Sequence, residues 1–461
     1  MKTFMLLVFL LTGAGSAFSA EPRIEGIWLG TLDLGPKKLR LAVTMTRSGE
    51  TLAGTLNSLD QSSGELPLKD LVLRDGKLTF ALPALGASYE GTLQGDAIAG
   101  TFFQRGMALP LTLARVEALP VPRRPQEPKK PYPYETEEVI VANGEVRLAG
   151  TLTLPRSAPP FHAVVLISGS GPQDRDETIF GHKPFLVLAD TLTRRGVAVL
   201  RVDDRGTGQS TGNRSGATTD DFAGDALACV KFLRARRNVA KIGLIGHSEG
   251  GFIAPMVATR SKDVAFIVLL AAPGLRGDQI VERQVETMYA AMGASPEEVE
   301  RAVALQREIL AIAKGTTDEA ALRAKLGELM TRKLAEASPE ERAIFTNFSA
   351  MIDAQVKRLN SPWYRWMLAY DPIPVLRGVR VPTLAINGGK DIQVGAKANL
   401  AAIAAAVPHA KVVELAGLNH LLQTAPTGGL DEYAAIEETV APVALETISE
   451  WIIKVTGSRS D

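Results

Sequence analysis

The sequence predicts a two-domain α/β protein, in which a small all-β barrel or sandwich precedes a larger domain with a mostly parallel sheet. Short β-rich runs separated by turn residues fill positions 23–115. A proline-rich segment follows, and beyond it apolar runs alternate with helical patterns. A chain of 461 residues is also long for one hydrophobic core.

Residues 1–20 are predicted to be a secretory signal peptide. Lys2 precedes a short apolar run at 4–11, and small residues at 17–20 supply a cleavage site. The alternative, an N-terminal membrane anchor, would need about 20 apolar residues. We therefore expect an exported protein, periplasmic or secreted, with no stable membrane insertion after cleavage.

Composition restricts the partners. Lys+Arg and Asp+Glu both number 51, so charge favours neither nucleic acid nor anionic lipid, and a small uncharged molecule is expected. Cys229 is the single cysteine, which excludes an intrachain disulfide. It lies in a helical pattern and is predicted to be a buried hydrophobe.

Residues 21–116 are predicted to form the all-β domain, with strands near 26–32, 39–46, 78–82 and 109–113. Gly-Thr recurs at positions 54, 91 and 100. Closure of the strands would remove exposed edges. This domain carries no catalytic constellation, so we expect a packing or spacer module, with ligand or glycan binding as the alternative.

The segment 117–136 is predicted to be a stiff, extended linker. Its prolines alternate with basic residues, which are expected to lie in solvent.

Residues 137–457 are predicted to form the α/β domain. Asn143-Gly144 indicates a hairpin, and apolar runs at 163–167, 196–202, 242–245, 265–270, 383–386 and 411–415 suit buried parallel strands. After the sixth strand, residues 274–370 read as about four amphipathic helices, with capping boxes beginning at Ser295 and Ser338. The aromatic segment 362–367 either lines a substrate pocket or packs this insert onto the core.

The motif Gly246-His247-Ser248-Glu249-Gly250 stands between an apolar strand and a helical pattern. Ser248 is therefore expected at the tip of a sharp turn, where a side chain at either flanking glycine would collide with neighbouring backbone. A second Gly-x-Ser-x-Gly match contains Ser210, but a polar loop follows it instead of a helix. The strand–turn–helix requirement favours Ser248.

This strand–turn–helix resembles the nucleophile elbow of α/β-hydrolases. Residues 132–457 resemble secreted members of the serine-aminopeptidase-like and carboxylesterase-like groups. The resemblance implies that the insert is a helical cap and that the triad follows the chain order Ser, acid, His. Residues 203–210 are also similar to a segment after the fourth strand of that superfamily, where its role is mainly structural.

The base and the acid are expected to follow the last two strands. His420 comes just after the run at 411–415, and a serine hydroxyl needs such a general base. Asp391 follows the run at 383–386 and, by the resemblance, holds the histidine. Asp371 and Asp431 are the substitutes if Asp391 is only a turn residue.

The oxyanion hole is expected to use the backbone N–H groups of Glu249 and Ser170. Many relatives carry His-Gly where this chain has Ser168-Gly169, but a backbone donor survives that change. The glycine-rich loop lacks the Gly-Lys-Ser/Thr of a phosphate loop, and no metal spacing or dinucleotide fingerprint is present. We therefore expect no metal and no cofactor.

The sequence thus predicts a serine hydrolase that cleaves carboxylic esters of a small-molecule acyl substrate through an acyl-enzyme. The motifs are not specific for substrate. Aminopeptidase-like or thioesterase activity on the same triad stays open, as does a non-catalytic exported ligand-binding protein.

Overall fold

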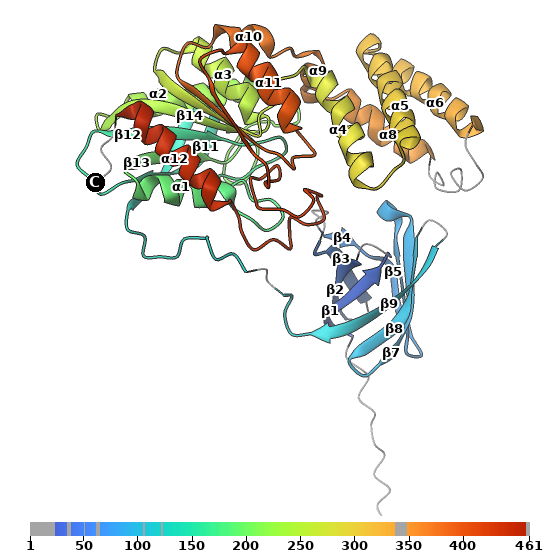
Figure 1. Cartoon of the computed structure of the whole chain (residues 1–461). Coiled ribbons are helices and arrows are strands. Elements are labelled where there is room, and N and C mark those ends of the chain that lie inside the picture. Colours follow the sequence, from blue (N-terminus) through green and yellow to red (C-terminus); the bar gives the residue numbers. More distant parts are fainter. Residues whose placement is uncertain are drawn as a thin grey trace, which may run out of the picture. The chain divides into compact units, whose positions relative to one another are not determined.

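The computed structural model describes residues 24–34, 38–49, 51–60, 65–104, 107–120, 123–336 and 348–457. Contacts divide the chain into two compact units, with the main boundary between Leu119 and Pro120, inside the predicted linker (Figure 1). The predicted signal peptide and the capping box at Ser338 lie outside the described residues.

The N-terminal unit is one antiparallel sheet. Its strands are β1 (Gly26–Asp33), β2 (Lys38–Ser48), β3 (Thr51–Ser58), β4 (Leu66–Pro67), β5 (Lys69–Arg74), β6 (Lys77–Leu82), β7 (Ala87–Gln94), β8 (Ala97–Gln104) and β9 (Met107–Val116), with a 3₁₀ turn at Pro83–Leu85. Their order in the sheet is β4-β3-β2-β1-β9-β8-β7-β6-β5. The first and last strands in sequence, β1 and β9, are hydrogen-bonded neighbours. The sheet curls into a nearly closed barrel, which decides between the two predicted all-β forms.

Tyr89 explains two of the recurrent glycines in this barrel. Its ring is buried, and its hydroxyl donates to the carbonyl oxygens of Ile98 and Leu111, at 3.0 and 3.1 Å. Gly91 and Gly100 pair across β7 and β8, and a Cβ at either would lie 2.6 Å from the Tyr89 hydroxyl. The glycines therefore make room for an interior phenol.

The C-terminal unit is built on an eight-stranded sheet. Its strands are β10 (Glu135–Asn143), β11 (Val146–Leu154), β12 (Phe161–Ile167), β13 (Val197–Val202), β14 (Val239–His247), β15 (Val264–Leu270), β16 (Thr383–Gly388) and β17 (Lys411–Leu415). The order is β10-β11-β13-β12-β14-β15-β16-β17, antiparallel through β10 and β11 and parallel from β13 onward. The predicted hairpin and mostly parallel sheet are confirmed.

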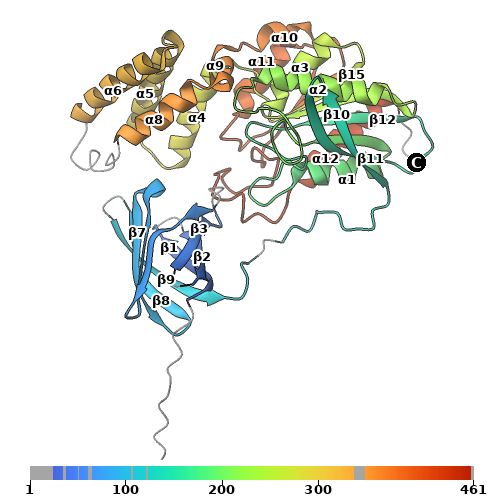
Figure 2. The same cartoon turned by 180° about the vertical axis from the view of Figure 1, so that it is seen from behind.

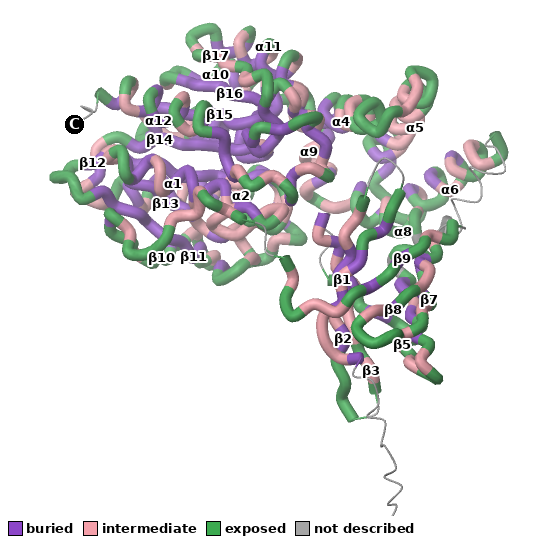
Figure 3. Tube along the Cα trace, turned by 60° about the horizontal axis from the view of Figure 1, so that its bottom comes forward, coloured by how far each residue is buried: buried purple, intermediate pink, exposed green. Residues whose placement is uncertain are grey.

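Helices cover both faces of this sheet, as its two-sided apolar strands require. One face carries α1 (Pro184–Arg194) and α12 (Pro442–Thr456), and the other carries α2 (Thr219–Arg234), α3 (Gly250–Arg260) and α11 (Ala396–Ala406) (Figures 1 and 2). The central strands are buried almost throughout (Figure 3). Cys229 is buried within α2, as predicted.

The insert lies between β15 and β16, the sixth and seventh strands of this sheet. Among the residues described there, it forms five helices and not the four expected: α4 (Gly277–Ala291), α5 (Pro296–Gly315), α6 (Glu319–Glu336), α8 (Phe348–Leu359) and α9 (Pro362–Ala369). The Ser295 capping box is present, since Ser295 and Glu298 each bond the other's backbone N–H. A short helix, α10 (Ile373–Gly378), leads back to the sheet.

The predicted linker is not a free spacer at Arg124. Arg124 donates to the carbonyl oxygens of Ala434 and Ile436, at 3.0 and 2.8 Å, and of Gly181. Arg124 was expected to lie in solvent, but these carbonyls hold its guanidinium in a partly buried position. Within the described residues, no helix is long and apolar enough to cross a membrane.

Candidate active site

Ser248 occupies the turn between β14 and α3. Its φ is +52°, a left-handed conformation that is strained for a residue with a side chain. Its N–H donates to the carbonyl of Leu270 at 2.9 Å, and its carbonyl accepts from Gly251 N–H at 2.8 Å. Ser248 is partly exposed, while its neighbours His247 and Glu249 are buried. The predicted strand–turn–helix is therefore present.

The two elbow glycines stand where backbone segments nearly touch. A Cβ on Gly246 would collide with the carbonyl group of Gly250, and a Cβ on Gly250 would collide with the carbonyl of Ile167. The turn can therefore approach β12 only because both positions lack side chains, as the sequence predicted.

Gly250→Ala is expected to destabilise the fold by at least about 2 kcal/mol, because the new Cβ would collide with the backbone of β12, which cannot move without disturbing the sheet. The measurement is urea unfolding followed by circular dichroism. Gly224→Ala is the matched control, since its Cβ in α2 would meet only the Asn143 amide at 3.5 Å. That variant should be neutral or gain up to about 1 kcal/mol. Equal stability of both variants would contradict this account of the elbow.

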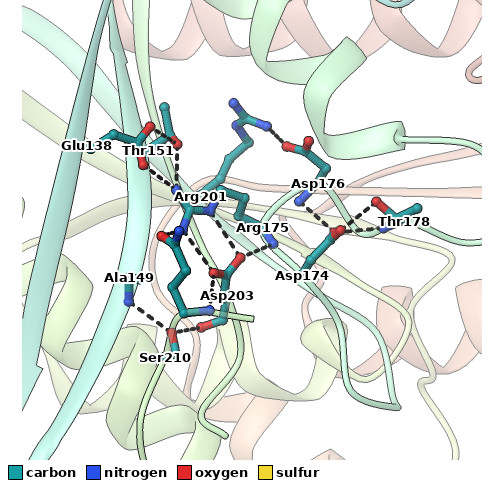
Figure 4. Close-up of polar contacts among 11 residues, drawn as sticks. Glu138, Ala149, Thr151, Asp174, Arg175, Asp176, Thr178, Arg201, Asp203 and Ser210 are labelled. Carbon is teal, nitrogen blue, oxygen red and sulfur yellow. Dashed lines mark hydrogen bonds and ion pairs between the residues drawn. The ribbon is translucent and has the colours of Figure 1, made fainter. Parts of the chain in front are cut away.

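Ser210, the serine of the second Gly-x-Ser-x-Gly match, forms hydrogen bonds with backbone groups. Its hydroxyl accepts from Ala149 N–H at 2.9 Å and donates to the carbonyl of Asp203 at 2.7 Å (Figure 4). The Ser210 side chain is buried, and no described histidine bonds it. This serine fastens the segment after β13 to β11, which is the structural role the sequence assigned to residues 203–210.

Asp391 and His420 meet beside the elbow. Asp391 lies after β16, and its Oδ1 accepts from the N–H groups of Gln393 and Val394, both at 2.8 Å. Its Oδ2 accepts from His420 Nδ1 at 2.7 Å, and both side chains are buried. Because a carboxylate only accepts, Nδ1 carries the proton and Nε2 is left with a free lone pair.

The loop that carries His420 is braced from several sides. The His420 N–H donates to the Tyr433 hydroxyl at 3.2 Å, and the buried Asn419 amide oxygen accepts from Leu421 N–H at 3.0 Å. Any Cβ at Gly388, the last residue of β16, would collide with the backbone of this loop. The predicted substitutes for Asp391 are both exposed, and Asp371 accepts from Ile373 N–H at the start of α10.

The β12–α1 loop, residues 168–183, passes directly beside Ser248. A Cβ on Gly169 would lie 3.2 Å from the Ser248 Cβ. Gly169 N–H donates to Glu177 Oε1 at 2.6 Å, so it is occupied. Among the described residues, none accepts from the N–H of Ser170 or of Glu249. These two N–H groups are the pair that the sequence predicted as oxyanion donors.

A network of ion pairs, buried or partly buried except at Glu138, fixes the same loop. Arg175 donates through Nε and Nη2 to the two oxygens of Asp203, at 3.0 and 2.9 Å, and through Nη1 to Glu138 at 2.6 Å. Arg201 pairs with Asp176 on the other side (Figure 4). A bidentate arginine pair of this kind restricts orientation as well as distance, so the loop is held rigidly against β11 and β13.

A small cavity of about 40 Å³ borders Gly169 and Glu249. Its remaining lining includes Val165, Phe222, Ile253, Asp204 and Arg214. Burial raises the pKa of Asp204 to about 6, although the Ser168 hydroxyl and Arg214 oppose the shift. Burial also raises the pKa of Glu249, against hydrogen bonds from Thr219 and Trp363. Charged groups of both signs therefore line the cavity, since Asp203 and Arg205 also border it.

The aromatic residues at the end of the insert pack the insert onto the core. Trp363 Nε1 donates to Glu249 Oε1 at 2.7 Å, and Trp366 stacks on Tyr370 with ring centroids 4.3 Å apart. Tyr364 is buried within the insert. The described lining of the cavity beside Gly169 contains none of these residues, so the structure supports the packing interpretation.

Parts of this chain are similar to known proteins. Residues 183–325 match the family described as serine aminopeptidase, S33. Over 326 residues the chain is 26% identical to esterase EstD of Thermotoga maritima, an alignment that spans 70% of this chain and 69% of EstD. The fold is that of an α/β-hydrolase.

Solved structures similar to this α/β-hydrolase include two esterases. Est1E of Butyrivibrio proteoclasticus with ferulic acid bound is 16% identical, with a TM-score of 0.42, and the match covers 69% of this chain and all of that one. Esterase Pf2001 of Pyrococcus furiosus is 14% identical, with a TM-score of 0.44, over 75% of this chain and all of the other.

Sequence reasoning missed two side chains of this α/β-hydrolase site. His247 Nδ1 lies 2.9 Å from Glu177 Oε1, and His247 Nε2 lies 3.0 Å from the carbonyl oxygen of His420. The sequence placed His247 beside Ser248 with its side chain directed away. The available signal was the charged run 174–177 in a loop after a buried strand, because such residues need buried partners if the loop packs inward.

Proposed function

We propose that this α/β-hydrolase cleaves carboxylic esters through a Ser248–His420–Asp391 triad and an acyl-enzyme. The observation that carries the proposal is the 2.7 Å bond from His420 Nδ1 to Asp391, which fixes the tautomer whose Nε2 can accept a proton. The strained, partly exposed Ser248 lies beside the His420 loop, since the rings of His247 and His420 are 4.9 Å apart.

In the acylation step, His420 Nε2 removes the Ser248 hydroxyl proton as Oγ attacks the ester carbonyl carbon. The carbonyl oxygen becomes an oxyanion, and the free N–H groups of Glu249 and Ser170 donate to it. The C–O bond to the alcohol then breaks, and His420 returns its proton to the departing alkoxide. The alcohol leaves and the acyl group stays on Ser248.

In the deacylation step, His420 Nε2 removes a proton from water, which attacks the acyl carbon. The same two N–H groups bind the second oxyanion. Its collapse breaks the bond to Ser248 Oγ, His420 returns the proton to Oγ, and the carboxylic acid is released. Asp391 stabilises the imidazolium in both steps and stays ionised.

The small size of the cavity beside Gly169 and Glu249 supports a short acyl or alcohol group as the bound part of the substrate. We also propose that the insert 274–370 acts as a cap. The bond from Trp363 on α9 to Glu249 supports this role, because it ties the insert to the residue that supplies an oxyanion donor.

The test is a panel of p-nitrophenyl esters, acyl thioesters and aminoacyl anilides of matched acyl length, hydrolysed by the wild type. The proposal predicts the highest kcat/KM on esters with short, uncharged acyl groups. Faster turnover of thioesters would indicate the thioesterase alternative, and faster turnover of anilides with a free amine would indicate the aminopeptidase. Absence of hydrolysis of all three would favour a ligand-binding protein.

Export to the periplasm or the medium is part of the proposal and rests on the sequence of residues 1–20. Amino-terminal sequencing of the protein from its native source should begin at residue 18, 20 or 21. A mature protein that begins at Met1 would contradict export.

A further inference from the structure

A second histidine–carboxylate pair lies behind the proposed triad. His247 and Glu177 are both buried, and their side chains meet through Nδ1 and Oε1 at 2.9 Å. The His247 ring lies 4.9 Å from the His420 ring, centroid to centroid, at an interplanar angle of 49°. The reaction steps proposed above use neither His247 nor Glu177.

The tautomer of His247 follows from its partners. Its Nε2 lies 3.0 Å from the carbonyl oxygen of His420, and a carbonyl can only accept, so Nε2 carries a proton. Glu177 Oε1 also accepts from Gly169 N–H at 2.6 Å. One further proton lies between His247 Nδ1 and Glu177, on one atom or the other.

Charge around the pair agrees with this arrangement. Burial alone would lower the pKa of His247, but the Glu177 carboxylate, with smaller contributions from the His420 carbonyl and Asp391, raises it overall. The pair is therefore electrically neutral as a unit, which makes its burial tolerable.

The backbone at both ends of the connection is strained. Glu177 has a φ of +52°, and Leu422, two residues after His420, has a φ of +59°. Left-handed conformations at residues with side chains persist only where surrounding contacts impose them, and they cluster at functional sites. Hydrogen bonds from the pair to Gly169 N–H and to the His420 carbonyl are contacts of that kind.

We propose that Glu177 and His247 are positioning residues, which lock the His420 backbone to the β12–α1 loop and occupy Gly169 N–H, leaving the N–H groups of Ser170 and Glu249 to bind the oxyanion. The connection runs from Gly169 through Glu177 and His247 to His420. It fixes the position of the proposed base relative to the proposed oxyanion donors. This inference rests on the proposed function.

Two substitutions at His247 separate its two bonds. In His247→Gln the amide nitrogen replaces Nε2 and can still donate to the His420 carbonyl. In His247→Asn the amide nitrogen replaces Nδ1, so the bond toward Glu177 is kept and the bond to His420 is lost. Glu177→Gln keeps an oxygen for Gly169 N–H but has no charge to pair with His247.

The readout is the split between kcat and KM on an aryl ester. His247→Asn should lower kcat by about 10- to 100-fold, because a displaced base acts in the transition state and contributes little to ester binding. KM should stay within about threefold, and His247→Gln should recover kcat to within about fivefold of the wild type. Glu177→Gln should lower kcat by about tenfold, with KM again little changed.

Three results would overturn the proposal: equal kcat in His247→Asn and His247→Gln, wild-type kcat in Glu177→Gln, or losses in KM alone. Nitrogen-15 NMR of the wild type gives a test that needs no folded variant. With only five histidines in the chain, the ring signals can be assigned, and His247 must carry its proton on Nε2. An unprotonated Nε2 would exclude the bond to His420. A wild type without esterase activity would refute the proposed function instead and leave this NMR test in force.

Discussion

Ser248→Ala is expected to lower kcat for aryl-ester hydrolysis by about 10⁶-fold, the scale seen when a serine hydrolase loses its nucleophile. Alanine removes only the hydroxyl, from a partly exposed position, and leaves the backbone hydrogen bonds of the turn in place. The melting temperature should therefore stay within about 3 °C of the wild type. Initial rates with a p-nitrophenyl ester and a thermal unfolding scan give both quantities.

Ser210→Ala is the matched control, because Ser210 stands in the other Gly-x-Ser-x-Gly segment. Its hydroxyl bonds Ala149 N–H and the Asp203 carbonyl, so its loss should cost about 1–3 kcal/mol of stability and leave turnover within about threefold. The opposite pattern, an active Ser248→Ala variant and an inactive but folded Ser210→Ala variant, would move the nucleophile to Ser210.

His420→Ala is expected to lower kcat by a similar factor, about 10⁶-fold, because Ser248 cannot be deprotonated at neutral pH without a base. The double variant Ser248→Ala/His420→Ala should be no slower than either single variant, since the two groups act as one unit. Kinetics of the two single variants and the double variant on one ester form the measurement. Additive losses would contradict a shared catalytic step.

Asp391→Asn tests the acid in the same series. It should lower kcat by about 10⁴-fold, less than loss of the base, because the amide can turn its nitrogen toward His420 and favour the wrong tautomer. Asp371→Asn and Asp431→Asn should leave kcat within about threefold of the wild type, since Asp391 already bonds His420. A larger loss at either of these positions would reassign the acid.

The parts of the fold set by local pattern were predictable. The strand runs, the Asn143-Gly144 hairpin and the elbow around Ser248 depend on periodicity and on glycine, and each is present in the structure. The order in which Asp391 and His420 follow the sheet came from resemblance to α/β-hydrolases. The loops that follow parallel strands lie at the same edge of the sheet. Asp391 and His420 follow two neighbouring parallel strands, so their side chains lie close together.

Features set by long-range pairing were not predictable. Arg124 was assigned to solvent because a proline-rich basic segment usually lies there, yet carbonyls about 310 residues away accept its hydrogen bonds. Glu177 and His247 are 70 residues apart, and only the packing of the β12–α1 loop against the elbow brings them into contact. The sequence contains no local signal for the Arg124 contacts. The charged run 174–177 indicates that Glu177 needs a buried partner, but it does not identify His247 as that partner.

Labelling with a serine-reactive fluorophosphonate tests the central claim most directly, because it reports the nucleophile without a choice of substrate. After incubation, intact-protein mass and peptide mapping locate the adduct. The account predicts one adduct per chain, on Ser248, absent in Ser248→Ala, retained in Ser210→Ala and strongly slowed in His420→Ala. An adduct on another residue, or no adduct on a wild type that hydrolyses esters, would contradict the assignment of Ser248.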